Sequence, residues 1–249
     1  MQALVYAQLL RARETGQKQL AVLIDPDKAS PEQLSQILQL ANDAAVDYLF
    51  AGGSLLVRGE TDNCVQQIKK ESNIPVILFP GNHIQLSRHA DGILLLSLIS
   101  GRNPEFLIGQ HVVAAPELRK SKLEIIPTGY LLIDGGNPTA ASYMSNTLPI
   151  PASKPEIAAA TAMAGEMLGF KTIYLDAGSG AGQVVPSAMI REVRRNIQIP
   201  LIVGGGIHTA AQAEAAAAAG ADLIVIGTAF EKNPGLLPKI AGCLKKIAD

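Results

Sequence analysis

Eight short aliphatic runs recur along the 249-residue chain, and helical patterns separate most of them. This alternation is typical of parallel strands that helices bury on both faces of a sheet. The runs are QLAVLIDP, DYLFAGG, IPVILFPG, DGILLLSLIS, LEIIPTGYLLID, KTIYLDAG, IPLIVGGG and ADLIVIGTA. Eight strand and helix units in about 250 residues match the usual size of a closed barrel. We therefore expect an α/β fold, a (β/α)8 TIM barrel that residues 1–249 form as a single domain.

Residues that commonly begin or end helices stand between the runs. Ser30 precedes Pro31 and is placed to cap a helix over PEQLSQILQLANDA. Ser187 and Thr209 are candidate caps of two later helices, and Gly220 is suited to the C-terminus of the second.

The connection between the third and fourth runs is unusually short. Only NHIQLSRHA lies between them, which is too little for a regular helix of three turns. We therefore expect the third helix to be missing or degenerate. Such a gap exposes the flank of the barrel, where an apolar groove could lie.

The composition excludes several classes of protein. Apolar residues make up 48% of the chain, charged residues 17% and aromatic residues 4%, which excludes disorder and predicts an aliphatic, alanine-rich interior. The net charge of −1 provides no broad electrostatic surface for nucleic acid or for an anionic membrane. Cys64 and Cys243 lack the spacing of zinc ligands, so we expect them to be packing residues.

Apolar stretches indicate where the protein resides. The longest, around Leu95, is far shorter than the roughly 18 residues of a spanning helix. The first stretch, MQALVYAQLLRARETGQKQ, has charges among its apolar positions and predicts an amphipathic helix instead of a signal peptide. We therefore expect a cytoplasmic protein with no transmembrane segment.

Glycine clusters close the late runs, at the rim where the active sites of such barrels lie. AGSGAG follows Asp176, Gly204–Gly206 end the seventh run, and Gly227 precedes Thr228 after the eighth. Backbone N–H groups can hold a phosphate where no side chain blocks close approach. Any one cluster could equally be a plain turn, but together they predict a phosphate site.

Acidic residues close the first and sixth runs. Asp25 and Asp27 offer carboxylates for a divalent cation such as Mg²⁺, with Ser54 as a further oxygen donor, although each could instead cap a helix. Asp176 is placed to accept a proton from an attacking hydroxyl group, or to be satisfied by nearby backbone N–H groups.

Tyr130 and the histidines are less informative. Tyr130 could line an apolar channel or pack in the core. The histidines share no metal or triad spacing, so they receive no role; they are His83, His89, His111 and His208.

Six motifs, in this order, resemble the geranylgeranylglyceryl phosphate synthase family, including its bacterial members and the related heptaprenylglyceryl phosphate synthase. They are LIDPDK, AGGS, EIIPTGY, YLDAGSGAG, VGGGI and VIGTAFEKNP, and the match runs from about Asp25 to Pro234. The glycine motifs occur in many phosphate-binding barrels, but YLDAGSG together with LIDPDK and IIPTGY is distinctive.

The resemblance implies a Mg²⁺-dependent prenyltransferase on a barrel without a regular third helix. Its reaction joins sn-glycerol 1-phosphate to a polyprenyl diphosphate, usually geranylgeranyl diphosphate, through an ether bond and releases diphosphate. It implies a prenyl channel bordered by Tyr130, with Asp25 and Ser54 at the metal and Asp176 as the catalytic residue. By position, the residues that would hold glycerol phosphate are Tyr174, Leu175, Asp176, Ala177, Gly178, Ser179, Gly180, Gly205, Gly206, Gly227 and Thr228.

Two positions depart from the family pattern. Leu23 stands where some relatives carry a lysine, and Lys28 is the residue that could replace its charge. Asp176 stands in place of a longer glutamate, which retains the chemistry and shortens the reach.

Two other functions fit the same rim. An isomerase or lyase of the histidine or tryptophan biosynthesis type would use Asp25 and Asp176 as an acid and base pair, and a noncatalytic phosphate-binding protein would use the glycines alone. A long apolar groove at the missing helix favours a prenyl donor, whereas a closed polar mouth favours the isomerase. A homo-oligomer is expected, although no sequence pattern specifies it, and none specifies the prenyl chain length.

Overall fold

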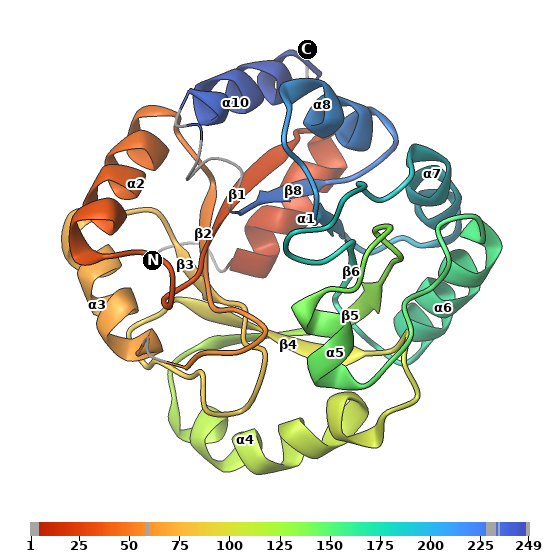
Figure 1. Ribbon diagram of the computed structural model, residues 1–249, viewed down its shortest axis with the longest axis horizontal. Helices are drawn as coiled ribbons and strands as arrows, with labels where there is room; N and C mark the ends of the chain where they lie inside the picture. The colour runs from red at the N-terminus through yellow and green to blue at the C-terminus, as the bar shows by residue number, and fades with distance from the viewer. Residues whose placement is uncertain (1–4, 58–59, 228–232, 234, 248–249) are drawn as a thin grey trace.

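Eight parallel strands close a barrel in sequence order in the computed structural model, which describes residues 5–57, 60–227, 233 and 235–247 (Figure 1). The last strand pairs with the first, with Val225 opposite Ala21. The predicted TIM barrel is thereby confirmed. The strands are β1 Gln19–Ile24, β2 Tyr48–Ala51, β3 Val76–Leu78, β4 Gly92–Leu98, β5 Glu124–Leu132, β6 Thr172–Asp176, β7 Leu201–Gly204 and β8 Leu223–Ile226.

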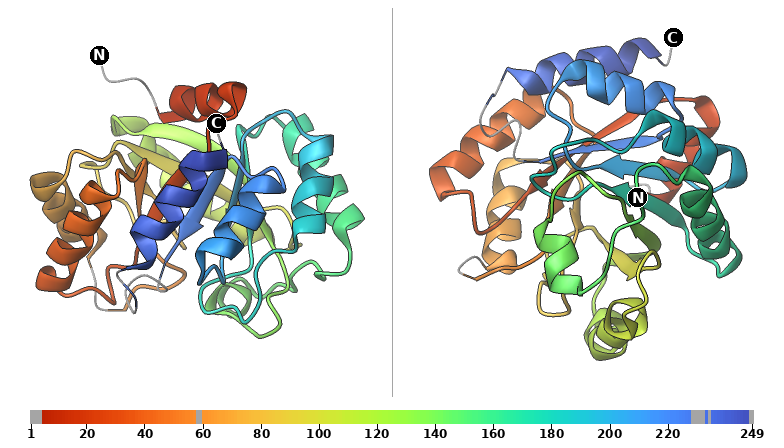
Figure 2. Two further views of the ribbon diagram at one scale, coloured as in Figure 1. Left: turned by 90° about the horizontal axis from the view of Figure 1, so that it is seen from above. Right: turned by 45° about the vertical axis from the view of Figure 1, so that its right-hand side comes forward.

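Helices surround this barrel, and α1 lies across the amino end of the strands (Figures 1 and 2). Val5 and Leu9 of α1 are buried in the same apolar cluster as the inward side chains of the strands. No helix of the described residues is long and apolar enough to cross a bilayer. The helices are α1 Val5–Thr15, α2 Pro31–Asp43, α3 Thr61–Glu71, the π-helical turn η1 Glu105–Gly109, α4 Gln110–Lys120, α5 Ala140–Ser145, α6 Pro155–Met167, α7 Ser187–Asn196, α8 Ala210–Ala218 and α10 Leu236–Ile247.

The helix ends follow the sequence signals at most positions. Ser30 and Thr209 each form a capping box, and Gly220 adopts a φ of +117° just beyond the end of α8. The prediction that Ser187 caps a helix is wrong, because Ser187 is the first residue of α7 and Pro186 occupies the cap position. Pro186 fixes an extended turn into the helix without a side-chain hydrogen bond.

The connection between β3 and β4 has no helix. Residues 79–91 form only turns, bends and irregular backbone between the two strands. The prediction of a missing third helix is therefore confirmed. α3 and α4 consequently flank a gap in the outer ring of helices (Figure 1).

The core has two layers of different composition. Between strands and helices it is aliphatic and alanine-rich, as predicted. Inside the barrel, however, four aromatic rings pack one against the next. The ring centroids are 6.0 Å apart for Phe50 and Phe79, 5.2 Å for Phe79 and Tyr174, and 5.5 Å for Tyr174 and Tyr130. These rings share the barrel interior with aliphatic side chains of the strands, such as Ile77, Leu94 and Ile126.

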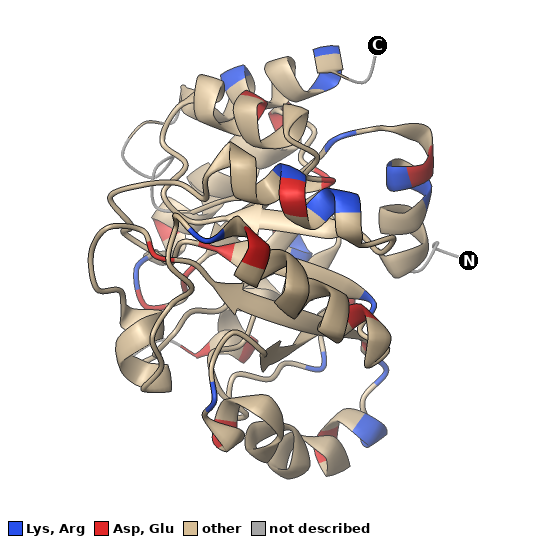
Figure 3. Ribbon diagram, turned by 90° about the vertical axis from the view of Figure 1, so that its right-hand side faces the viewer, with Lys and Arg blue, Asp and Glu red and all other residues tan. Residues whose placement is uncertain are grey.

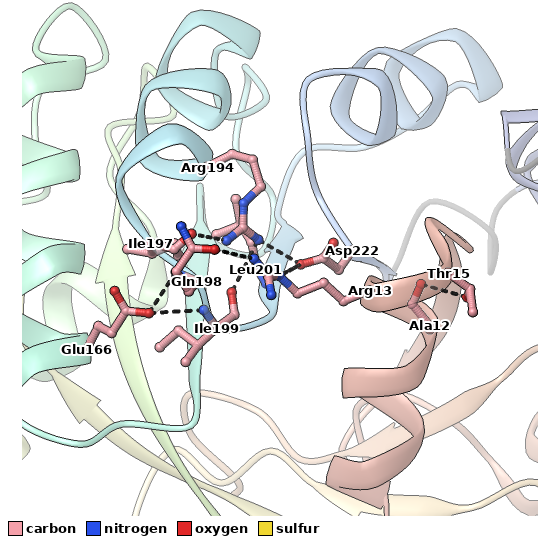
Figure 4. A network of polar contacts seen from close by, with 10 residues as sticks. All are labelled: Ala12, Arg13, Thr15, Glu166, Arg194, Ile197, Gln198, Ile199, Leu201 and Asp222. Atoms are coloured by element: carbon pink, nitrogen blue, oxygen red, sulfur yellow. Dashed lines mark hydrogen bonds and ion pairs between the residues drawn. The ribbon is translucent and has the colours of Figure 1, made fainter.

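Positions of Lys and Arg are interspersed with those of Asp and Glu along the helices on the side of the ribbon seen in Figure 3. One buried group of charges lies at the amino end of the barrel (Figure 4). Asp222 Oδ2 accepts hydrogen bonds from Arg194 Nη1 at 2.9 Å and from the Leu201 amide at 2.8 Å. Arg13 of α1 lies 3.9 Å from the same oxygen. The Asp222 carboxylate thus joins α1, α7, β7 and β8.

Replacing Asp222 with Ala should lower the free energy of unfolding by about 3 to 5 kcal/mol, because it leaves the partly buried Arg194 guanidinium without its anion. Denaturant unfolding followed by circular dichroism measures this change. Glu117→Ala is the control, since the Lys120–Glu117 pair is exposed and should contribute less than about 1 kcal/mol. Equal effects of the two substitutions would contradict the assignment.

Candidate active site

A cavity of about 410 Å³ lies at the carboxyl end of the strands, and it is called the polar cavity here because charged side chains, among them Asp25, Lys28 and Asp176, line it together with apolar ones. Its lining comes from the last residues of β1, β5, β6 and β8, from the loops that follow β1, β2, β3, β6, β7 and β8, and from α5. The predicted site residues that line it are Asp25, Ser54, Tyr130, Tyr174, Asp176, Ser179, Gly180, Gly205, Gly206 and Gly227. Thr228, also predicted, lies outside the described residues.

Three predicted residues do not line the polar cavity. Leu175 and Ala177 point into the layer between strands and helices, because side chains alternate along a strand and Tyr174 and Asp176 take the inward positions. Gly178 uses its N–H to bind Asp176, so the structure places it beside the cavity and not in the lining.

The glycines of the late loops permit very close packing of the backbone. Gly205 and Gly206 have φ values of +82° and +70°. A Cβ atom on Gly205 would lie 2.5 Å from Asp176 Oδ1 and 2.6 Å from the amide nitrogen of Gly178. Only glycine fits this position, and the loops after β6 and β7 therefore meet through their backbones.

Asp176 is a buried carboxylate with one hydrogen bond to each oxygen. It is 7% exposed. Its Oδ1 accepts from the Gly178 amide at 2.7 Å, and its Oδ2 accepts from the Tyr130 hydroxyl at 2.6 Å. Burial raises the pKa of Asp176, and the two hydrogen bonds oppose part of that rise. Each carboxylate oxygen retains a further lone pair, so Asp176 can still accept a proton from a bound hydroxyl group.

Tyr130 acts as a hydrogen-bond donor in this arrangement. Burial and the adjacent Asp176 charge raise the pKa of Tyr130 well above its ordinary value, so the phenol keeps its proton. Tyr130 lines both the polar cavity and a second, apolar cavity. The sequence alone could not distinguish such a position from ordinary core packing.

Asp25 lies on the opposite side of the polar cavity and pairs with Lys28. Lys28 Nζ is 2.6 Å from Asp25 Oδ2, and the Asp27 amide donates to Asp25 Oδ1 at 3.1 Å. Asp27 Oδ2 accepts the Val57 amide at 2.6 Å and so holds the loop after β2. Within the described ranges, no three His, Cys, Asp or Glu side chains gather in a metal-binding group.

The second cavity, the apolar groove, follows the open flank between β3 and α4. Its lining is mainly apolar and comes from the helix-free connection, β4, η1, α4 and α5. The residues that line it are Gly53, Ser54, Phe79, Pro80, Gly81, Asn82, His83, Leu86, Ile93, Leu95, Leu96, Leu98, Phe106, Gln110, His111, Ala114, Leu118, Tyr130, Leu132, Ala141, Met144 and Ser145.

The apolar groove and the polar cavity meet. Five residues line both, and they are Gly53, Ser54, Phe79, Tyr130 and Ala141. A polar reactant in the cavity and an apolar reactant in the groove would therefore face one another beside the hydroxyl of Tyr130, which binds Asp176.

Two histidines to which the sequence assigns no role, His83 and His111, line the apolar groove. His83 Nδ1 lies 2.6 Å from Gln110 Oε1, and His111 Nε2 lies 2.8 Å from the carbonyl oxygen of Leu96. Both rings are held by neutral partners of the groove wall. No spacing in the sequence identifies them as groove residues, because one lies in the helix-free connection and the other in α4.

Comparisons with known proteins agree with one another. A sequence model of the PcrB family matches residues 13–244. The chain is 51% identical over 244 residues to the geranylgeranylglyceryl phosphate synthase of Chitinophaga pinensis, covering 98% of this chain and 97% of the relative. It is 48% identical over 212 residues to the synthase of the same name from Thermococcus kodakarensis, covering 85% and 83%.

A solved structure is similar over nearly its whole length. It is the (S)-3-O-geranylgeranylglyceryl phosphate synthase of Thermoplasma acidophilum in complex with its substrate sn-glycerol-1-phosphate. The TM-score is 0.92 at 33% sequence identity, and the match covers 98% of this chain and 99% of that one.

Proposed function

The chain belongs to the PcrB family, and we propose that it is a geranylgeranylglyceryl phosphate synthase. This enzyme is a prenyltransferase that joins sn-glycerol 1-phosphate to a polyprenyl diphosphate through an ether bond and releases diphosphate. The observation that carries the proposal is the meeting of a polar cavity with an apolar groove at shared residues. An isomerase or lyase of small sugar phosphates has no use for such a groove, and that alternative is not favoured.

The late glycine loops suit the phosphate of glycerol phosphate. Gly180, Gly205, Gly206 and Gly227 bring backbone without side chains to one side of the polar cavity. Backbone N–H groups in such loops bind phosphate oxygens. The Thermoplasma acidophilum relative, described as a complex with sn-glycerol-1-phosphate, supports the same substrate for this chain.

The apolar groove suits the hydrocarbon of the prenyl donor. Leu95, Leu98 and Phe106 are among the residues of its walls. An isoprenoid chain that binds between them would remove its own apolar surface and theirs from water, which favours binding. The diphosphate at the end of that chain would then lie at the junction, near Ser54 and Asp25.

We expect a Mg²⁺ ion to bind on this side of the cavity in place of the Lys28 ammonium group, which lies 2.6 Å from Asp25 Oδ2. Asp25 and Ser54 offer a carboxylate and a hydroxyl oxygen, and Mg²⁺ commonly takes one or two protein carboxylates while water and substrate phosphate complete its shell. When bound, the ion would stabilise negative charge on the departing diphosphate.

The ether bond forms when the terminal hydroxyl oxygen of glycerol phosphate attacks the first carbon of the prenyl group. The bond between that carbon and the diphosphate oxygen breaks, and diphosphate leaves with the bonding electrons. The hydroxyl proton passes to the Asp176 carboxylate, whose raised pKa makes it a better acceptor than an ordinary aspartate. The hydrogen bond from Tyr130 fixes the orientation of that carboxylate.

We expect the purified protein to convert radiolabelled sn-glycerol 1-phosphate into an ether lipid when it is given Mg²⁺ and a prenyl diphosphate. Extraction of label into an organic phase measures the product, and donors of graded chain length determine the preferred length. The absence of product with every donor would refute the proposed function.

Asp176→Asn should lower kcat about 10²- to 10⁴-fold while the affinity for sn-glycerol 1-phosphate changes little. The amide is isosteric and can accept from Gly178 and donate to the Tyr130 hydroxyl, but it cannot take the proton. Steady-state kinetics and calorimetric binding separate the two effects. Asp134→Asn makes the same change on an exposed loop residue and should leave kcat unaltered. Full activity of Asp176→Asn would remove Asp176 from the mechanism.

Tyr130→Phe should move the acidic limb of the pH profile of kcat/KM to higher pH. Activity requires the ionised form of Asp176, so it falls as the pH drops through the pKa of Asp176. The hydrogen bond from Tyr130 lowers that pKa, and its loss therefore raises it further. Tyr48→Phe is the control, since Tyr48 is a buried barrel tyrosine that binds Gln19 at the amino end. An unmoved limb in Tyr130→Phe would contradict the assignment.

A further inference from the structure

Gln85 joins two loops of the site from within the helix-free connection. Its side chain is buried, with 2% of the residue exposed. Its Oε1 accepts from the amides of Gly53 at 3.3 Å and Gly81 at 3.2 Å, and its Nε2 donates to the carbonyl oxygen of Gly53 at 2.9 Å. The side-chain amide of Gln85 therefore binds both the N–H and the carbonyl group of Gly53 in the loop after β2. It also binds the N–H group of Gly81 in the loop after β3.

The two loops that Gln85 joins are in direct backbone contact. A Cβ atom on Gly52, where φ is +148°, would overlap the carbonyl oxygen of Phe79. A Cβ atom on Gly81 would overlap the carbonyl oxygen of Gly53 and lie 2.6 Å from that of Ser54. The loops are therefore in backbone contact at these glycines, and the Gln85 side chain adds hydrogen bonds to both of them.

The position of Gly53 matters for the chemistry at the junction. Gly53 and Ser54 line both the polar cavity and the apolar groove. A Cβ atom on Gly53 would lie 3.3 Å from the carboxylate of Asp25. A shift of this loop would therefore move Ser54 relative to Asp25.

We propose that Gln85 is a positioning residue for the diphosphate-bearing half of the site. It acts through Gly53 and holds Ser54 beside Asp25, while the glycerol phosphate side, built on the loops after β6 to β8, does not depend on it. Two acceptor contacts and one donor contact require an amide at this reach, which glutamine provides. The inference rests on the proposed function.

Gln85→Met keeps the length of the side chain and removes its three hydrogen bonds. We expect kcat/KM for the prenyl diphosphate to fall about 10- to 100-fold, since small misplacements of reacting groups have effects of this size. Calorimetry should show weaker binding of inorganic pyrophosphate in the presence of Mg²⁺. Binding of sn-glycerol 1-phosphate should change less than about twofold, because its cradle lies on other strands.

Gln67→Met is the matched control, and it should leave all three measurements unchanged. Gln67 of α3 donates hydrogen bonds to the Pro31 carbonyl oxygen of α2 and to Glu71 of its own helix, and it lines neither cavity. Should Gln85→Met not fold, Gln85→Asn keeps the amide, shortens its reach and should weaken pyrophosphate binding in the same selective manner. Equal loss of both ligands, or no loss of either, would overturn the role of Gln85. A wild-type protein that forms no product would instead refute the proposed function.

Discussion

The helix-free connection between β3 and β4 determines how this barrel can be used. In a regular barrel a helix covers each pair of strands and buries their outward side chains. Here residues 79–91 leave part of β4 and the facing side of α4 uncovered, and these surfaces form the walls of the apolar groove. The omission of one helix therefore creates an apolar site that reaches the polar end of the strands.

The omission also removes the element that would hold the loop after β3. A helix packs its apolar face on the strands and fixes both of its ends, whereas an irregular connection must bind its neighbours through individual contacts. Gln85 and the close contacts of Gly52 and Gly81 provide such contacts here. The same omission thus accounts for the groove and is accompanied by close backbone contacts of glycines at its edge.

The repeated strand pattern made the barrel predictable, because eight buried parallel strands require eight aliphatic runs. The missing helix was equally visible, since a connection can be too short whatever its sequence. Details that depend on the direction of a side chain could not be predicted from the sequence in this way. Leu175 and Ala177 lie within a site motif, yet strand alternation turns them toward the helices. The hydrogen bond from Tyr130 to Asp176 joins residues 46 positions apart, and no motif spacing in the sequence predicts it. The oligomeric state and the cytoplasmic location stay predictions.

The phosphate of glycerol phosphate and the diphosphate of the prenyl donor are both anionic, and the proposed site stabilises their negative charges in different ways. Lys28 is the sole lysine or arginine among the described residues that line the polar cavity, and it is paired with Asp25. Glycerol phosphate keeps its charge throughout the reaction, so fixed backbone dipoles at the glycine loops suffice to hold it. Diphosphate gains negative charge as the carbon–oxygen bond breaks, and a divalent cation at Asp25 and Ser54 would stabilise that additional charge. The proton released from the hydroxyl group also needs an acceptor, and Asp176 is placed to bind it. Burial raises the pKa of Asp176 and so favours its protonated form. The division of charge between the two sides of the cavity therefore follows the course of the reaction.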